Sequence, residues 1–161
     1  MRKWLILALL ALVALLLTAA VAGPLGPMPG MYLGGQATDP PSQWSSVAVP
    51  EQIQLETRGG LLPRVVNLWI VESDNELYVF GATDSGWVNA TRSDPQVRLR
   101  MEDQTYSLMA APLAQPDLTV YERYLARYAD DYPDIVAGMP AIDELDGAAG
   151  VIFHLQRPPS E

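Results

Sequence analysis

Two kinds of side chain in this sequence could bind a ligand: arginines that recognise anions, and flat aromatic rings. Arg58 and Arg64 flank the segment GGLLP and could hold an anion between them through forked hydrogen bonds. Each could instead pair with Glu56, Glu72 or another acid, because the chain carries 19 acidic residues against ten basic ones. The ion pairs are the simpler interpretation, and the anion site stays open beside them.

A second group of arginines comprises Arg92, Arg98 and Arg100. This basic patch would suit a ligand phosphate or an anionic lipid head group. The simpler interpretation is a solvated strand face whose charges are balanced by Glu102 and Asp103.

Trp69 and Trp87 could stack on a flat ring, since an aromatic face offers contact area at little entropic cost. Trp87 lies in the stretch GWVNATRSDP, where a helical turn must end before Pro95 because the preceding residue avoids helical angles. A tryptophan at such a helix start more often closes the end of a barrel by packing. We interpret a stripe of four tyrosines in the same way, as core beneath a helix: Tyr121, Tyr124, Tyr128 and Tyr132.

Other chemistry has less support. His154 is the single histidine and lies in an apolar strand without a GxSxG motif, so a structural role is favoured over a Ser-His-Asp relay. The chain has no cysteine, which excludes disulfides, thiolate metal sites, a cysteine nucleophile and a lipid-modified cysteine. Asp130, Asp131 and Asp134 could ligate a hard cation, but they lack the EF-hand pattern, and no metal site is predicted.

The N-terminus predicts a location. Arg2 and Lys3 precede a charge-free run from Trp4 to Ala22, which is close to the roughly 20 residues that span a bilayer. Ala20-Val21-Ala22 also fits a signal-peptidase site, so the protein would be secreted if it were cleaved after Ala22. Retention is favoured, which predicts a single-pass inner-membrane protein whose C-terminal domain lies in the periplasm or outside.

The remaining chain is acidic. Residues 23–161 keep all 19 acidic side chains but only eight of the ten basic ones, so their net charge is −11 rather than −9. Such a balance opposes nucleic-acid binding, because phosphate contacts need clustered cations. All eight bases are arginine, which excludes Schiff-base and P-loop chemistry.

Composition divides the chain into three parts: a signal anchor or signal peptide at residues 1–22, a Pro- and Gly-rich linker and arm at residues 23–50, and one folded domain at residues 51–161. Trp44 is the one large anchor of the arm. Period-two alternation then predicts strands, and the segment around Val66 to Val71 is apolar on both faces, as in a barrel wall covered by a helix. The expected strands are 52–57, 65–72, 76–81, 97–101, 105–112 and 149–156, and the expected helices are 86–94 and 117–128, with a possible helical turn at 141–145.

This order resembles the flavin-binding split-barrel proteins, the group that contains pyridoxamine 5'-phosphate oxidases and deazaflavin-dependent nitroreductases. The stretches that carry the resemblance are LETRG, VVNLWIVESDNELYVFGA, GWVNATRSDPQVRLRMEDQTYSLMA and the closing VIFHLQRP, within residues 52–158. It implies a mainly β (α+β) fold: a six-stranded antiparallel split β-barrel with rim helices, here preceded by one N-terminal hydrophobic helix.

The resemblance also implies an oxidoreductase that binds flavin mononucleotide (FMN) or a deazaflavin, and a homodimer that builds its site across a two-fold interface. The positions that match the family's cofactor site are Thr57, Arg58, Arg64, Asn67, Thr83, Ser85 and Trp87. Arg58, Arg64 and Asn67 would face the phosphate, with Ser85 and Trp87 near the loop.

Three features depart from the family pattern. Leu61 and Leu62 stand where a phosphate loop is usually polar, Ala90 stands where the rim helix usually carries an asparagine, and the export signal is unusual for cytoplasmic cofactors. The two leucines and the export signal favour an alternative, a non-catalytic binding or accessory protein of a membrane complex, with a membrane-protein partner, that kept the barrel and lost the cofactor.

Overall fold

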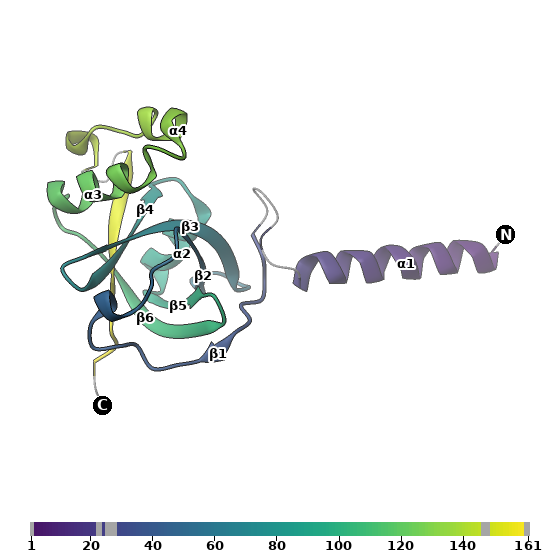
Figure 1. Ribbon diagram of the computed structural model, residues 1–161. Coiled ribbons are helices and arrows are strands. Elements are labelled where there is room, and N and C mark those ends of the chain that lie inside the picture. The colour runs from purple at the N-terminus through teal and green to yellow at the C-terminus, as the bar shows by residue number, and fades with distance from the viewer. Residues whose placement is uncertain (1, 22–23, 25–28, 146–148, 160–161) are drawn as a thin grey trace.

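Six antiparallel strands close into a barrel in the computed structural model, which describes residues 2–21, 24, 29–145 and 149–159 (Figure 1). Around the barrel the strand order is β6, β5, β2, β3, β4, β7, and the pairing of β7 with β6 closes the ring. The strands are β1 Gln36–Ala37, β2 Gln52–Thr57, β3 Arg64–Ser73, β4 Glu76–Ala82, β5 Gln96–Met101, β6 Gln104–Pro112 and β7 Gly150–Gln156. The helices are α1 Arg2–Val21, η1 Trp44–Ser46, α2 Gly86–Ser93, α3 Leu118–Tyr128, α4 Pro133–Ala137 and η2 Ile142–Glu144.

Alternation along the strands builds the core. Ile53, Leu55 and Leu99 point inward and are buried, as period-two patterning requires. Strand β3 is covered on both faces, as its sequence predicted: Ile70 belongs to the barrel interior, whereas Val71 belongs to a second cluster beneath α3.

Two tight turns set the register of the hairpins. Asp74 and Asn75 both have positive φ, 53° and 66°, so they form the type I′ turn that matches the twist of the β3–β4 hairpin. Glu102 has a φ of 52° in the turn between β5 and β6. Both turns fall in the gaps between the expected strands, at residues 73–75 and 102–104.

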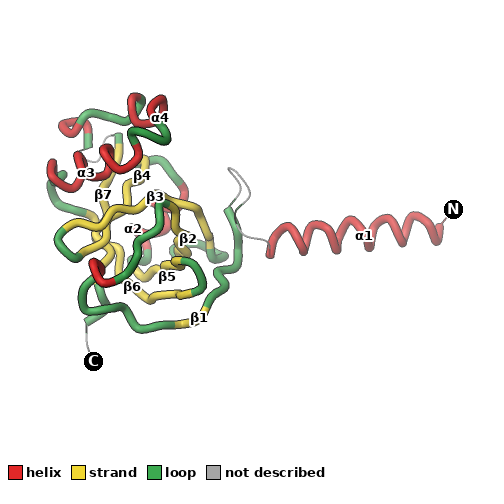
Figure 2. Tube along the Cα trace, in the orientation of Figure 1, coloured by secondary structure: helices red, strands yellow, loops and turns green. Residues whose placement is uncertain are grey.

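Helices α3 and α4 lie against one side of the barrel (Figure 2). The Asp117 carboxylate caps α3 by accepting from the Val120 N–H at 3.1 Å. On the inner face of α3, Tyr128 stacks on Trp69 with ring centroids 4.4 Å apart, and its hydroxyl accepts from the Ile70 N–H at 2.9 Å. The tyrosine stripe is therefore core packing, in agreement with the sequence.

The arm before the barrel adds two elements that the sequence did not predict. The short strand β1 pairs in parallel with β6, and η1 places Trp44 in the barrel interior. The Trp44 ring is fully buried and meets Tyr106 edge-on at 5.2 Å. The arm thus closes one part of the core, and Trp44 is its anchor.

The N-terminal run forms helix α1, which projects away from the barrel (Figure 1) and exposes its leucines. In the part of the chain that the structure describes, no helix is long and apolar enough to cross a membrane. The predicted membrane span is therefore not confirmed. The predicted cleavage position after Ala22 lies outside the described residues.

Candidate functional site

A groove of about 540 Å³ lies between the β2–β3 loop and α2. We call it the α2 groove. It is lined by Pro29, Gly30, Met31, Gly59, Gly60, Leu61, Leu62, Pro63, Arg64, Gly86, Asn89, Ala90 and Ser93. Its volume is in the range of small-molecule sites.

Close backbone contacts fix the walls of this groove. A Cβ added to Gly59 would lie 1.9 Å from the carbonyl oxygen of Ala90, so only glycine lets the loop pack this closely on α2. On the other side, Gly30 and Val65 exchange two backbone hydrogen bonds of 2.8 Å each. The loop is therefore held both by the helix and by the arm.

Arg64 is the charged residue of the groove. A Cβ on Gly86 would lie 2.2 Å from Nη1 of Arg64, so the guanidinium lies directly against the first residue of α2. Within the described residues, no carboxylate lies within ion-pair distance of Arg64. The first N–H groups of a helix lack partners within the helix and carry partial positive charge. An unpaired arginine beside a helix start is suited to bind an anion.

Ser85 precedes this helix start and does not cap it with its side chain. Its buried hydroxyl has no hydrogen-bond partner among the described residues. The buried hydroxyl of Thr57, at the end of β2, also has no hydrogen-bond partner among the described residues. Buried polar atoms without partners are uncommon, because each costs free energy of about 1–3 kcal/mol.

Arg58 does not join Arg64. Its Nε donates to Glu56 at 2.9 Å, and Nη1 of Arg98 reaches the other oxygen of the same carboxylate at 3.2 Å. Glu56 is only 4% exposed, so two arginines compensate one buried charge. For Arg58 the ion-pair interpretation is confirmed. Arg58 and Arg98 line a separate groove of about 420 Å³ beside β5 and β6.

The remaining predicted residues are dispersed. Asn67 is exposed on β3 and lines a third hollow of about 330 Å³ with Arg100. Arg100 itself donates to the Glu102 carbonyl at 2.7 Å and lies 3.6 Å from Asp103, as the solvated-face interpretation expected. The Thr83 N–H donates to the Ala149 carbonyl at 3.4 Å.

Trp87 lies in the barrel core and is 6% exposed. Its ring lies 5.5 Å from that of Phe153, and a Cβ on Gly81 would lie 2.3 Å from it. This position agrees with the packing interpretation of the sequence. Of the seven predicted cofactor residues, only Arg64 lines the α2 groove.

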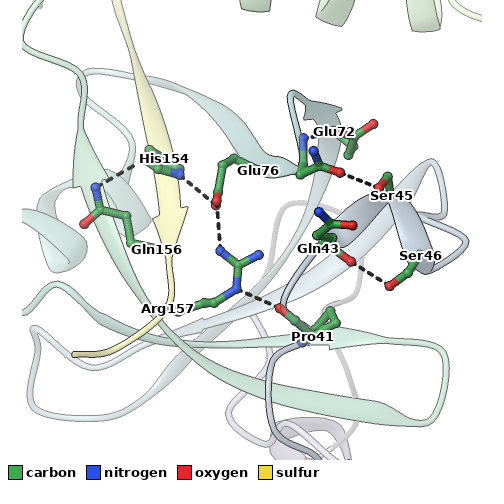
Figure 3. Close-up of polar contacts among 10 residues, drawn as sticks. Pro41, Gln43, Ser45, Ser46, Glu72, Glu76, His154, Gln156 and Arg157 are labelled. Carbon is green, nitrogen blue, oxygen red and sulfur yellow. Dashed lines mark hydrogen bonds and ion pairs between the residues drawn. The ribbon is translucent and has the colours of Figure 1, made fainter. Parts of the chain in front are cut away.

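His154 belongs to a separate polar cluster with Glu76 of β4 and with Arg157, which follows β7 (Figure 3). Its Nε2 lies 3.1 Å from Glu76, which also accepts from Arg157 at 2.8 Å. Arg157 donates in turn to the Pro41 carbonyl at 2.7 Å and lies over the Trp44 ring. Burial raises the pKa of Glu76, but the hydrogen bonds and charges of Arg157 and His154 outweigh it, so the pKa is lowered overall. We call these residues the Glu76 cluster.

Among the described residues, no three Asp, Glu or His side chains lie close enough together to hold a metal ion. This applies to Asp130, Asp131 and Asp134 as well.

Sequence reasoning missed most of the α2 groove. Met31 comes from the arm, which has no motif, and Asn89 and Ser93 were not singled out as site residues within GWVNATRSDP. They meet only because the barrel brings the arm and α2 to the same loop. The glycines were the one sequence feature that could have indicated the groove. A side chain at Gly59 would collide with the Ala90 carbonyl, and one at Gly86 would collide with the Arg64 guanidinium.

No protein-family model and no curated protein matches the sequence. Solved structures similar to the chain include a NimC/NimA family protein from Clostridium acetobutylicum, with 14% identity, a TM-score of 0.49, and coverage of 65% of this chain and 73% of that one. The heme storage protein HutZ from Vibrio cholerae has 16% identity, a TM-score of 0.49, and coverage of 68% and 83%. An F420 reductase has 18% identity, a TM-score of 0.48, and coverage of 74% and 96%.

These similar structures are split-barrel proteins of the pyridoxamine 5'-phosphate oxidase-like kind. The closed pairing of six antiparallel strands within the chain itself confirms the six-stranded barrel with helices that the sequence resemblance implied.

Proposed function

We propose that the barrel binds a flavin-type cofactor, FMN or a deazaflavin, in the α2 groove and uses it for oxidoreduction. The observation that carries the proposal is Arg64: an arginine with no acidic partner among the described residues, lying against the start of α2 in a groove of about 540 Å³.

The residues of the groove suit such a molecule. Arg64 would hold the phosphate, because a guanidinium forms paired hydrogen bonds with phosphate oxygens. Asn89 and Ser93 offer polar contacts, while Pro63 and Ala90 offer apolar area to a flat ring. A bound flavin or deazaflavin would supply hydride transfer, and the protein would supply binding and orientation.

The test is a titration of the full chain with FMN and with a deazaflavin, followed by absorbance and fluorescence. We expect saturable binding that Arg64→Ala weakens by about tenfold to a hundredfold, the loss typical of a charged hydrogen bond of roughly 1.5–3 kcal/mol. Arg92→Ala is the matched control, since it removes an exposed arginine of α2 that lies outside the groove lining. Equal loss in both variants would mean that only general charge attracts the ligand.

A second candidate is a non-catalytic binding or accessory protein that has the barrel without the cofactor. Specific observations favour it: Arg58 is engaged by Glu56, Trp87 is buried, and Leu61 occupies the supposed phosphate loop. A chain that binds neither cofactor while remaining folded would support this candidate and exclude the first.

We further propose that the protein is a homodimer. On the outward face, Gln54 of β2 lies between Asn67 of β3 and Arg100 of β5, so this part of the barrel wall is polar. Helix α3 packs farther along β3, against Trp69 and Val71. Stable interfaces bury about 1,600 Å² in total, about 800 Å² from each partner. Native mass measured in detergent tests this proposal, and a monomer at working concentration would contradict it.

We also propose that the N-terminal segment attaches the protein to a membrane, with the barrel on the outer side. Trp4 and the leucines of α1 are exposed, and Arg2 and Lys3 precede them. Fractionation of cells with N-terminal sequencing tests the proposal. A chain found at the membrane with an intact N-terminus supports it, whereas release after Ala22 supports secretion.

A further inference from the structure

The α2 groove has an apolar rim that the fold leaves uncovered. Leu61 is 100% exposed, Leu62 is 59% exposed, and Met31, which lines the same groove, is 40% exposed. We call these three residues the apolar rim. Outside α1, the described residues include only six exposed large apolar side chains: Met31, Tyr32, Leu61, Leu62, Leu118 and Ile135. Half of them gather at this rim, and such gathering marks an interaction surface, unlike scattered single exposures.

The backbone displays these leucines instead of hiding them. Hairpin loops usually carry Gly, Asn, Asp or Ser at their tips, whereas this loop reads Gly-Gly-Leu-Leu-Pro. Gly59 is fixed against the Ala90 carbonyl, and Pro63 has a fixed φ before β3 begins. The loop is thus supported at both ends while its tip points away from the core.

The position of the rim is set by the arm that follows α1. Gly30 is hydrogen-bonded to Val65, so the chain arriving from α1 reaches the barrel beside the base of this loop. The eight steps from Val21 to Pro29 span at most about 29 Å when fully extended. Helix α1 and the rim therefore lie within reach of one surface, and Figure 1 shows α1 departing from the barrel as a separate apolar rod.

Charge also distinguishes the rim from the rest of the molecule. The chain has a net charge of −9, yet none of the described residues that line the α2 groove is acidic, and Arg64 is the charged one. Anionic head groups repel carboxylates and attract cations over about a Debye length. This is the part of the acidic barrel that an anionic lipid surface would tolerate.

We propose that the apolar rim enters the interface of a lipid bilayer, so that the mouth of the α2 groove faces the membrane surface. Leu61 and Leu62 would lie among the head groups and upper acyl chains, the depth that interfacial apolar side chains reach. The inference builds on the proposed membrane attachment of α1 and is independent of the proposed cofactor.

The absence of cysteine makes the test direct, because one introduced thiol can carry one environment-sensitive dye. The full chain with Leu61→Cys is labelled with nitrobenzoxadiazole and added to vesicles of phosphatidylethanolamine with phosphatidylglycerol. The matched control is Ile135→Cys, an exposed apolar position on α4. Emission shift and quenching by brominated lipids report contact with acyl chains.

We expect the dye at position 61 to shift to shorter wavelength and to be quenched by bromolipids, while the dye at position 135 remains aqueous. Because the dye is itself apolar, a second label at Met31→Cys is measured with and without Leu61→Ser and Leu62→Ser. If the apolar rim inserts, the substitutions Leu61→Ser and Leu62→Ser should abolish bromolipid quenching of the dye at position 31.

Three outcomes would overturn the inference. If the chain binds vesicles but the dye at position 61 stays in water, the proposed insertion of the apolar rim is wrong, and the proposed attachment through α1 remains supported. If the chain does not bind vesicles, membrane attachment through α1 and insertion of the apolar rim are both wrong, and the proposal of cofactor binding is not affected. If position 61 is shielded equally without lipid, a second copy of the chain or another part of it covers the rim instead.

Discussion

Arg64 and Arg157 have the same functional group and opposite surroundings. Arg157 donates to Glu76 and to the Pro41 carbonyl and lies over the Trp44 ring, so its contacts are made within the chain (Figure 3). Arg64 lies against Gly86 in an open groove with no acidic partner among the described residues. The first arginine joins parts of the fold, and the second is free to meet a ligand.

The difference shows how a structural cation can be told from a binding one. A guanidinium that is already paired and stacked gains little from an added anion and loses its partners on binding it. An unpaired guanidinium beside helix N–H groups gains both charge and hydrogen bonds. The predictions that follow probe this contrast, from the largest expected effect on stability to the smallest.

Removal of the Arg157 side chain should cost the most. Arg157→Ala leaves Glu76 without its closest cation and frees the Pro41 carbonyl, so we expect the free energy of unfolding to fall by about 2–3 kcal/mol. Denaturant unfolding of the full chain measures it. Arg157→Lys should recover only part of the loss, because an ammonium cannot donate in two fixed directions. Full recovery would show that charge alone matters.

Gly59→Ala, in the wall of the α2 groove, should have the second-largest effect on stability. A Cβ there collides with the Ala90 carbonyl oxygen, so the loop must move off α2, at a cost of about 1–2 kcal/mol. Amide exchange should then speed up in the β2–β3 loop and α2. Gly60→Ala is the control, because its Cβ meets only the Leu62 carbonyl oxygen at 3.8 Å. Equal effects at both positions would contradict the proposed close packing.

Stability should also depend on acid through Glu76. Because its pKa is lowered in the folded chain, the unfolded chain binds protons more readily, and unfolding becomes easier as the pH falls. This contribution is complete above the ordinary value of 4.5 and is lost as the pH falls through the lowered value. Glu76→Gln should flatten the acid limb of a stability–pH curve. The control variant is Glu122→Gln, at an exposed position of α3.

Arg64→Ala should leave the free energy of unfolding unchanged within about 0.5 kcal/mol, the usual range for a surface substitution. Thermal unfolding without ligand measures this baseline. The same variant should lose the stabilisation that FMN or a deazaflavin gives to the unmodified chain. A large loss without ligand would place Arg64 with Arg157 as a structural residue.

The sequence predicted the barrel better than the groove, for physical reasons. Strand alternation is a local property, so β2 was predicted at Gln52–Thr57, as observed. The sequence also showed that β3 has apolar residues on both faces, and the structure buries both faces. The pairing of Arg58 with Glu56 was also local, because residues two apart on a strand share a face.

The groove depends on contacts between distant segments. Arg58 and Arg64 flank one loop in the sequence but line different grooves, because the packing of Gly59 on Ala90 redirects the chain between them. The contact of Trp44 with the core and the bond from Arg157 to Pro41 have no local signature either. Such contacts follow from the closed barrel and not from any single segment.

Closure by the final strand has a consequence for the order in which the protein can fold during synthesis. Strand β7 pairs with both β4 and β6, and Arg157 bonds to Pro41 across 116 residues of sequence. A growing chain therefore carries two unpaired strand edges until β7, Gly150–Gln156, leaves the ribosome. Until β7 emerges, the nascent polypeptide is an open sheet, and the pairing of β7 with β4 and β6 closes this sheet into a barrel.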